Sequence, residues 1–152
     1  MYKKVIVLLV LLGFSLLSYS EVGIAYKDYQ KLDKQEILCV VNVIKYEARP
    51  SFSGRRSVFD IVFNRSKKFD KSYCQIILAK SQFSFIHYHW DKKLTEKDLK
   101  IYYDIVVVGE PVVTDEDVLW YHADSIKNPW KGMKRMGRYD GNIFYKKHLH
   151  SK

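Results

Sequence analysis

The chain has 152 residues, of which 47% are hydrophobic and 28% are charged, and its formal net charge is +9. This length is typical of one globular domain, and we find no repeat, low-complexity tract or internal linker that would indicate a fibrous or multidomain protein. A basic surface can serve nucleic acid, anionic lipid or an acidic cell-wall polymer, so charge alone does not choose the partner.

The N-terminus has the pattern of a signal peptide. Lys3 and Lys4 precede an apolar run that extends to Leu17, and the small residues Ser18 and Ser20 follow where a signal peptidase cleaves. The run is shorter than the roughly 20 apolar residues of a membrane span. We therefore expect a signal peptide at residues 1–20, export to the periplasm or cell wall, and one domain at residues 21–152. An uncleaved leader, which would be the only membrane contact, is the alternative, and export argues against nucleic acid as a partner.

Two cysteines, Cys39 and Cys74, follow the leader. In an oxidising compartment such a pair predicts a disulfide, and two buried free thiols are the alternative. The bond would tie the first helix to the segment near Ile76. With no further cysteine in the chain, a cysteine-based zinc site is not expected.

Local signals mark the starts and ends of four helices. Asp33 and Glu36 form a capping-box pattern for the first helix, and Pro50 disfavours helical geometry at Arg49, so this helix should end just past Glu47. The other three are expected to open at Ser53-Gly54 and close near Asn64-Arg65, to run from Tyr73 to Ala79 after Ser72, and to run from Thr95 to Val108 before Gly109.

The C-terminal third has the pattern of short strands. Residues 119–122 read as one strand, and Met133–Tyr139 and Asn142–Lys146 read as a hairpin turned by Asp140-Gly141. Helices followed by a small antiparallel sheet predict an α+β fold.

Glu47 is a carboxylate beside an apolar helical stripe. At about 100° per residue it lies at the edge of the face formed by Ile37, Val40, Val41, Ile44 and Ala48. Burial raises the pKa of a carboxyl group, and a protonated carboxyl near neutral pH can act as the general acid that breaks an acetal bond. The alternative is a solvent-facing glutamate that pairs with Arg49.

Several separated blocks occur in an order that points to one family. They are Tyr46-Glu47-Ala48-Arg49, Asn64-Arg65, Gln82-Phe83-Ser84-Phe85, Trp120-Tyr121-His122-Ala123, Pro129-Trp130 and Ile143-Phe144-Tyr145. In this order the chain resembles the bacterial and phage cell wall hydrolase family that includes the spore cortex-lytic enzymes. The resemblance extends from about Leu38 to Tyr145.

The resemblance implies a lysozyme-like fold and a peptidoglycan glycosidase, often a lytic transglycosylase, with Glu47 as the key acid. It implies cleavage between N-acetylmuramic acid and N-acetylglucosamine, with peptidoglycan as the partner and no cofactor or metal. We also expect a monomer. The glycan groove is expected to include Gln82, Ser84, Phe85, Tyr121 and His122.

The chain departs from the family pattern at a few positions. Pro50 and Ser51 stand where the family usually has Gly-Glu, and Ser53 stands at a later acidic position. Phe85 replaces the usual Trp of its block, and Asn142 replaces the family's His. The first of these changes alters the loop that directly follows the proposed acid.

Other chemistries remain open from the sequence. A hydrolase usually uses a second carboxylate, for which Asp60, Asp115 and Asp124 are the candidates, whereas a single acid suffices for a transglycosylase. His87-Tyr88-His89 with His122 could be the ligand set of a zinc amidase if the first two histidines share one side of a strand. A wall-binding module without catalysis is the third alternative.

Two further features have simple alternative interpretations. Tyr121 and Trp130 could be core aromatics or sugar-stacking rings, and the sequon Asn64-Arg65-Ser66 is interpreted as chance.

Overall fold

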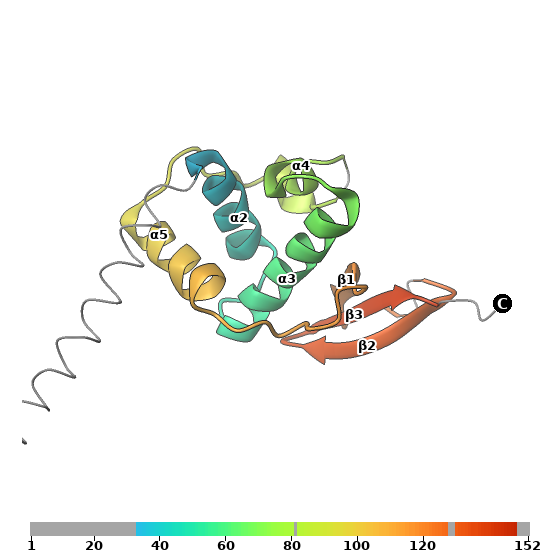
Figure 1. The fold of residues 1–152 in the computed structure, drawn as a ribbon. Coiled ribbons are helices and arrows are strands. Elements are labelled where there is room, and N and C mark those ends of the chain that lie inside the picture. Colours follow the sequence, from blue (N-terminus) through green and yellow to red (C-terminus); the bar gives the residue numbers. More distant parts are fainter. Residues whose placement is uncertain (1–32, 81, 128–129, 149–152) are drawn as a thin grey trace, which may run out of the picture. The chain divides into compact units, whose positions relative to one another are not determined.

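The computed structural model describes residues 33–80, 82–127 and 130–148, so the expected signal peptide at residues 1–20 lies outside the described part. The described residues from Lys34 onward form one compact unit. Within the unit, helices come first and an antiparallel sheet comes last, which confirms the α+β prediction (Figure 1). No helix in the described ranges is both long and apolar enough to cross a membrane.

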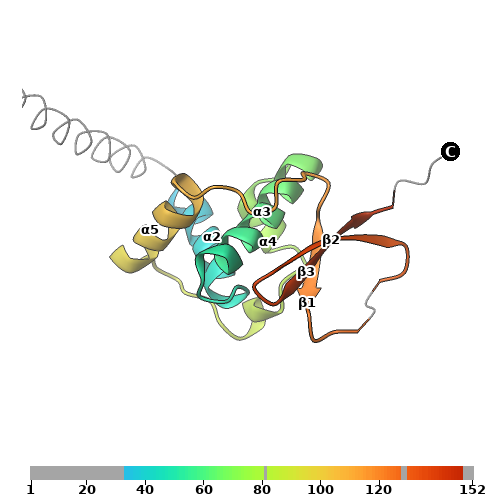
Figure 2. The ribbon, with the colours of Figure 1, turned by 90° about the horizontal axis from the view of Figure 1, so that it is seen from below.

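The helices form a cluster in which α3 lies next to the sheet and α5 lies on the side away from it (Figures 1 and 2). They are α2 (Lys34–Tyr46), α3 (Phe52–Phe69), α4 (Tyr73–Ile77) and α5 (Glu96–Tyr102), with the 3-10 helix η1 (Ser84–His87) before α5 and the π-helix η2 (Tyr103–Val107) directly after it. Since α2 is buried over residues 37–44, it forms the centre of the helical part.

The starts of α4 and α5 agree with the capping signals in the sequence. Ser72 and Gln75 form a capping box at α4, and Thr95 and Asp98 form one at α5. The predicted stop before Gly109 is also confirmed, although the last turn after α5 is π-helical. Helix α4 ends at Ile77 rather than at Ala79.

Helix α3 differs from the prediction at both ends. Its N-cap is Ser51, whose hydroxyl accepts a hydrogen bond from the backbone N–H of Gly54 at 2.9 Å, so the helix begins before Ser53. It also continues past Arg65 and ends at Phe69, where Asp70 adopts a left-handed conformation. The prediction of an end near Asn64-Arg65 was wrong because these polar residues do not stop the helix: they point inward and bind the chain before the sheet.

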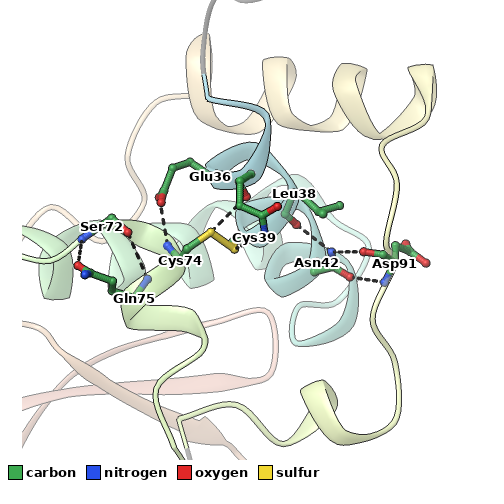
Figure 3. The surroundings of a disulfide bond; sticks show 9 residues. Glu36, Leu38, Cys39, Asn42, Ser72, Cys74, Gln75 and Asp91 are labelled. Carbon is green, nitrogen blue, oxygen red and sulfur yellow. Dashed lines mark hydrogen bonds between the residues drawn. A yellow bond between two sulfur atoms is a disulfide. The ribbon is translucent and has the colours of Figure 1, made fainter.

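The disulfide between Cys39 and Cys74 is formed, with a Cα–Cα distance of 5.3 Å, and it joins α2 to α4 (Figure 3). A side-chain bond reinforces the same contact, because Glu36 Oε2 accepts a hydrogen bond from the backbone N–H of Cys74 at 3.1 Å. On the other side of α2, the buried Asn42 exchanges two hydrogen bonds with the backbone of Asp91 (Figure 3). Contacts on two sides of α2 therefore hold in place the helix that leads to Glu47.

The sheet contains β1 (Trp120–Ala123), β2 (Met133–Tyr139) and β3 (Asn142–Lys147), all antiparallel and in the order β1-β3-β2. Asp140 and Gly141 turn the predicted hairpin, and both have positive φ, as a tight two-residue turn requires. One face of the sheet packs on α3 through Phe144, which is fully buried with Ile61.

Buried polar side chains of α3 hold the segment that leads into β1. Asn64, only 4% exposed, donates hydrogen bonds to the carbonyls of Asp115 and Val118 at 3.1 and 3.0 Å. This buried, bonded amide is not placed to accept a glycan, in agreement with the interpretation of the sequon as chance. The same contacts fix the position at which β1 begins.

Candidate active site

Glu47 follows the last residue of α2 and remains in the helical hydrogen-bond pattern. Its backbone N–H donates to the carbonyl of Val43 at 3.0 Å, although the helix itself ends at Tyr46 rather than just past Glu47. The side chain is half-buried. The end of a rigid, cross-linked helix thus holds the carboxyl group at the edge of the core.

Burial raises the pKa of Glu47 above its ordinary value, and hydrogen bonds from the backbone N–H groups of Ser84 and Phe85 act in the opposite direction. These two amides belong to the first turn of η1, where N–H groups have no partner within the helix. The carboxyl group therefore has two stabilised states. The partly buried surroundings favour the protonated acid, and the amides stabilise the carboxylate once the proton has left.

Tyr121 lies close enough for the charge of Glu47 to act on its hydroxyl. Burial, together with this carboxylate, raises the pKa of Tyr121 far above the usual value, so its hydroxyl stays protonated. Arg65 is near the same hydroxyl and partly offsets the shift. The phenol therefore remains a hydrogen-bond donor beside the carboxyl group.

Arg65 connects three parts of the chain around the site: helix α3, Leu119 just before β1, and the segment of Gln82 and Phe83. It lies on α3, its Nε donates to the carbonyl of Leu119 at 2.8 Å, and its Nη1 donates to Gln82 Oε1 at 3.1 Å. Its guanidinium also lies over the Phe83 ring, 5.8 Å from the centroid. Sequence reasoning used Arg65 only as part of a motif and missed this role, although a charged residue in the middle of an apolar helix face was the available signal.

The five residues expected in the glycan groove are not all in one place. Ser84, Phe85 and Tyr121 lie around Glu47, and Gln82 reaches the group through Arg65. The Phe85 ring is buried, 5.8 Å from the Tyr46 ring and 6.2 Å from the Trp90 ring, so its contribution to Glu47 is its backbone N–H.

His122 lies on the opposite face of β1. Its Nε2 is 2.7 Å from the Tyr145 hydroxyl and its Nδ1 is 2.6 Å from the carbonyl of Ala123, while the neighbouring Tyr121 ring stacks on Phe144 toward α3. Adjacent residues of a strand point to opposite faces. Tyr121 and His122, both expected near the glycan, therefore point to different faces of β1, as strand alternation in the sequence already indicates.

The loop after Glu47 is anchored to the tip of the β2–β3 hairpin. Ser51, besides capping α3, donates a hydrogen bond to Asp140. The Arg49 guanidinium lies against Gly141 so closely that a Cβ atom there would come within 2.5 Å of it. Although Pro50 and Ser51 depart from the family pattern, this loop therefore has its own attachment.

Asp60, the first candidate for a second carboxylate, is only 3% exposed and acts as a buried anchor. Its Oδ1 accepts a hydrogen bond from Arg56 Nε at 2.8 Å, and its Oδ2 accepts one from each of the backbone N–H groups of Val112 and Val113, also at 2.8 Å. All of these partners are structural, so Asp60 stabilises the packing of α3 against the chain before β1.

The other two candidates are also engaged in ion pairs. Asp115 binds Lys146 Nζ at 2.6 Å, an interaction that lowers the pKa of this aspartate, and Asp124 pairs with Arg138. Each of these two carboxylates is therefore held by a basic side chain away from Glu47's own contacts.

The histidines do not form the ligand set of the zinc alternative. His87 ends the 3-10 helix η1, so His87-Tyr88-His89 is not the strand on which that interpretation depended. Both ring nitrogens of His122 face partners on the far face of the sheet. Among the described residues, no group of three or more His, Cys, Asp or Glu side chains is arranged to hold a metal ion.

A hollow of about 290 Å³ opens beside this group of residues. It lies between α3, α4 and β1, and its walls include Arg65, Gln82, Leu119 and Trp120. Glu47 and Tyr121 are not among its lining residues, whereas Arg65 and Gln82, which are hydrogen-bonded to each other, both line it. The site thus combines one acid of raised pKa with two amide donors, and the hollow lies on the side of the site that carries Arg65 and Gln82.

A family model described as Cell Wall Hydrolase matches residues 50–145, which is more than half of the chain. The match begins after Glu47, so the acid itself lies outside the matched segment, whereas Arg65, Gln82 and Tyr121 lie inside it. The comparisons with curated proteins and with solved structures gave no match.

Proposed function

Because the chain belongs to the Cell Wall Hydrolase family, its substrate class is peptidoglycan, and we propose that it cleaves the glycan strand as a lytic transglycosylase. The bond cleaved lies between N-acetylmuramic acid and N-acetylglucosamine, and Glu47 acts first as acid and then as base. The observation that supports this role most directly is the environment of Glu47, in which burial raises the pKa while the amides of Ser84 and Phe85 favour the charged form.

In the first step, protonated Glu47 donates its proton to the glycosidic oxygen, and the bond between the anomeric carbon and that oxygen breaks. The carboxylate left behind is stabilised by the two η1 amides. It then accepts the proton of the muramic 6-hydroxyl, whose oxygen attacks the anomeric carbon. The product is a 1,6-anhydromuramic end, and Glu47 returns to the protonated state.

The contacts of the three candidate aspartates favour this mechanism over hydrolysis. A hydrolase usually uses a second carboxylate near the acid, about 5 to 9 Å away. Asp60, Asp115 and Asp124 are instead bound to Arg56, Lys146 and Arg138, respectively. An intramolecular hydroxyl nucleophile needs no such residue.

The family assignment and the disulfide both fit a protein that works outside the cytoplasm, where disulfides persist. We propose that residues 1–20 direct export and that the substrate is reached in the periplasm or the cell wall. Export of this kind would bring the enzyme to the compartment that contains peptidoglycan.

The test is digestion of purified peptidoglycan followed by mass analysis of the soluble products. The proposal expects anhydro-muropeptides from the wild-type chain and none from Glu47→Gln, whose amide keeps the shape of the side chain but cannot act as a general acid. Glu116→Gln is the matched control, because Glu116 is exposed and pairs with Lys67 at the surface. It should digest like the wild type.

Each alternative has its own result. Reducing-end products would indicate a hydrolase, and chelator-sensitive release of stem peptides would indicate an amidase. Biological activity that survives Glu47→Gln would indicate a wall-binding module. Folded wild-type protein that releases no fragment would refute the glycosidase proposal.

A further inference from the structure

The face of the sheet that does not pack on α3 carries a groove of about 810 Å³, a volume within the range of ligand sites. We call it the outer groove. Its lining includes Lys127, Trp130, Lys131, Arg135, Ile143 and Tyr145.

A rigid group of aromatic rings forms one part of the outer groove. The rings of His122 and Tyr145 stack with centroids 5.0 Å apart, and Trp130 meets both of them edge to face at 5.4 and 5.7 Å. The hydrogen bond between His122 and the Tyr145 hydroxyl fixes the pair further. Trp130 nevertheless remains 42% exposed. An exposed ring with fixed neighbours can bind an apolar sugar face with little loss of conformational entropy.

The charges of the outer groove select an anionic ligand. Lys127, Lys131 and Arg135 line it, whereas its one carboxylate, Asp124, is already paired with Arg138. Rings that stack with sugars, placed among cations, match a glycan whose substituents carry carboxylates. An element that lies on a lipid surface presents one continuous apolar face to the headgroup boundary. In the outer groove, Ile126 and Trp130 instead line a hollow together with cations, and a hollow of this kind suits a strand that enters it.

The outer groove is linked through shared lining residues to the hollow that contains Arg65. A smaller hollow of about 200 Å³ shares Trp130 and Lys131 with it and adds Trp120. Trp120 in turn lines the hollow that contains Arg65 and Gln82. A polymer in the outer groove can therefore run past two tryptophans, around the edge strand β1, toward the candidate active site.

We propose that the outer groove is a second binding site for the peptidoglycan strand, distinct from the point of cleavage. It holds the sugar rings on Trp130 and the stem-peptide carboxylates on Lys127, Lys131 and Arg135. The inference takes its ligand class from the proposed function, but it concerns binding of the polymer and not the chemistry at Glu47.

The binding test uses the full chain with Glu47→Gln, so that the polymer is not consumed, and measures co-sedimentation with insoluble peptidoglycan. Trp130→Ala should weaken retention about tenfold, as expected for a central aromatic contact. Arg135→Glu should also weaken retention and reduce its dependence on salt. Phe63→Ala and Lys93→Glu, an exposed aromatic and an exposed cation outside the groove, should bind like the parent. Circular dichroism checks that each variant is folded.

A kinetic test separates this site from catalysis. With Glu47 intact, Trp130→Ala should raise KM for intact peptidoglycan and leave kcat unchanged. Its cleavage of short soluble muropeptide oligomers, which do not reach the outer groove, should match that of the wild type.

Two results would overturn the inference. One is unchanged retention in both Trp130→Ala and Arg135→Glu. The other is that Trp130→Ala and Arg135→Glu lose binding to phosphatidylglycerol vesicles or to duplex DNA but keep their retention on peptidoglycan. This second result would assign the groove to a lipid surface or to nucleic acid. If the wild type cleaves no glycan while the variants still lose retention, the proposed function fails and the second site stands.

Discussion

Replacing Asp60 by asparagine tests whether this carboxylate is structural or catalytic. In the structure its two oxygens accept from Arg56 and from two backbone N–H groups, and every partner is a donor. An asparagine has one oxygen and one NH₂ group. Whichever way the amide turns, a donor faces a donor in a buried place, and the Arg56 charge loses its counter-ion.

The expected loss of unfolding free energy is about 3–5 kcal/mol, the cost of breaking a buried ion pair by changing one partner. This is a large fraction of the roughly 5–15 kcal/mol that stabilises a typical domain. With a urea m-value of about 2 kcal/mol/M, the midpoint of denaturation should fall by roughly 2 M.

Urea denaturation followed by circular dichroism measures this change, and Asp117→Asn is the matched control. Asp117 and Lys68 are both more than half exposed and lie 3.5 Å apart, so its loss should change stability by less than about 0.5 kcal/mol. Digestion of peptidoglycan at low temperature should show that folded Asp60→Asn protein retains its activity. Wild-type stability combined with lost activity would refute the structural role and restore Asp60 as a second catalytic carboxylate.

Two further predictions concern the acid and its helix. Ser84→Pro removes one N–H donor from the Glu47 carboxylate, and Phe83 already has the extended backbone that precedes a proline (φ −136, ψ 124). Because the acid must be protonated and the variant loses an influence that lowers its pKa, the alkaline limb of the kcat/KM profile should move to higher pH. The plateau rate should fall about tenfold or more; an unchanged profile would contradict this. Cys39→Ser with Cys74→Ser opens a disulfide across 35 residues and should cost about 4 kcal/mol in a chemical denaturation experiment; if oxidised and reduced wild-type protein unfold at the same denaturant concentration, the prediction fails.

Much of the fold follows from local signals. Thr95 with Asp98, Ser72 with Gln75, and the Asp140-Gly141 turn each act through residues adjacent in the chain, so a sequence window contains the whole interaction. The end of α3 was not predicted in this way. Asn64 and Arg65 resemble a stop signal until the chain of residues 115–119 is present to accept their hydrogen bonds.

The site shows the same division. The sequence alone identified Glu47 as a carboxyl group at the edge of a buried helical face and identified the blocks that contain Ser84 and Tyr121. Only the tertiary structure brought the η1 amides to Glu47 and bound Gln82 to Arg65. The physical reason is that a helical or strand period shows which residues share a face. Which face meets which partner depends on packing between segments far apart in the chain.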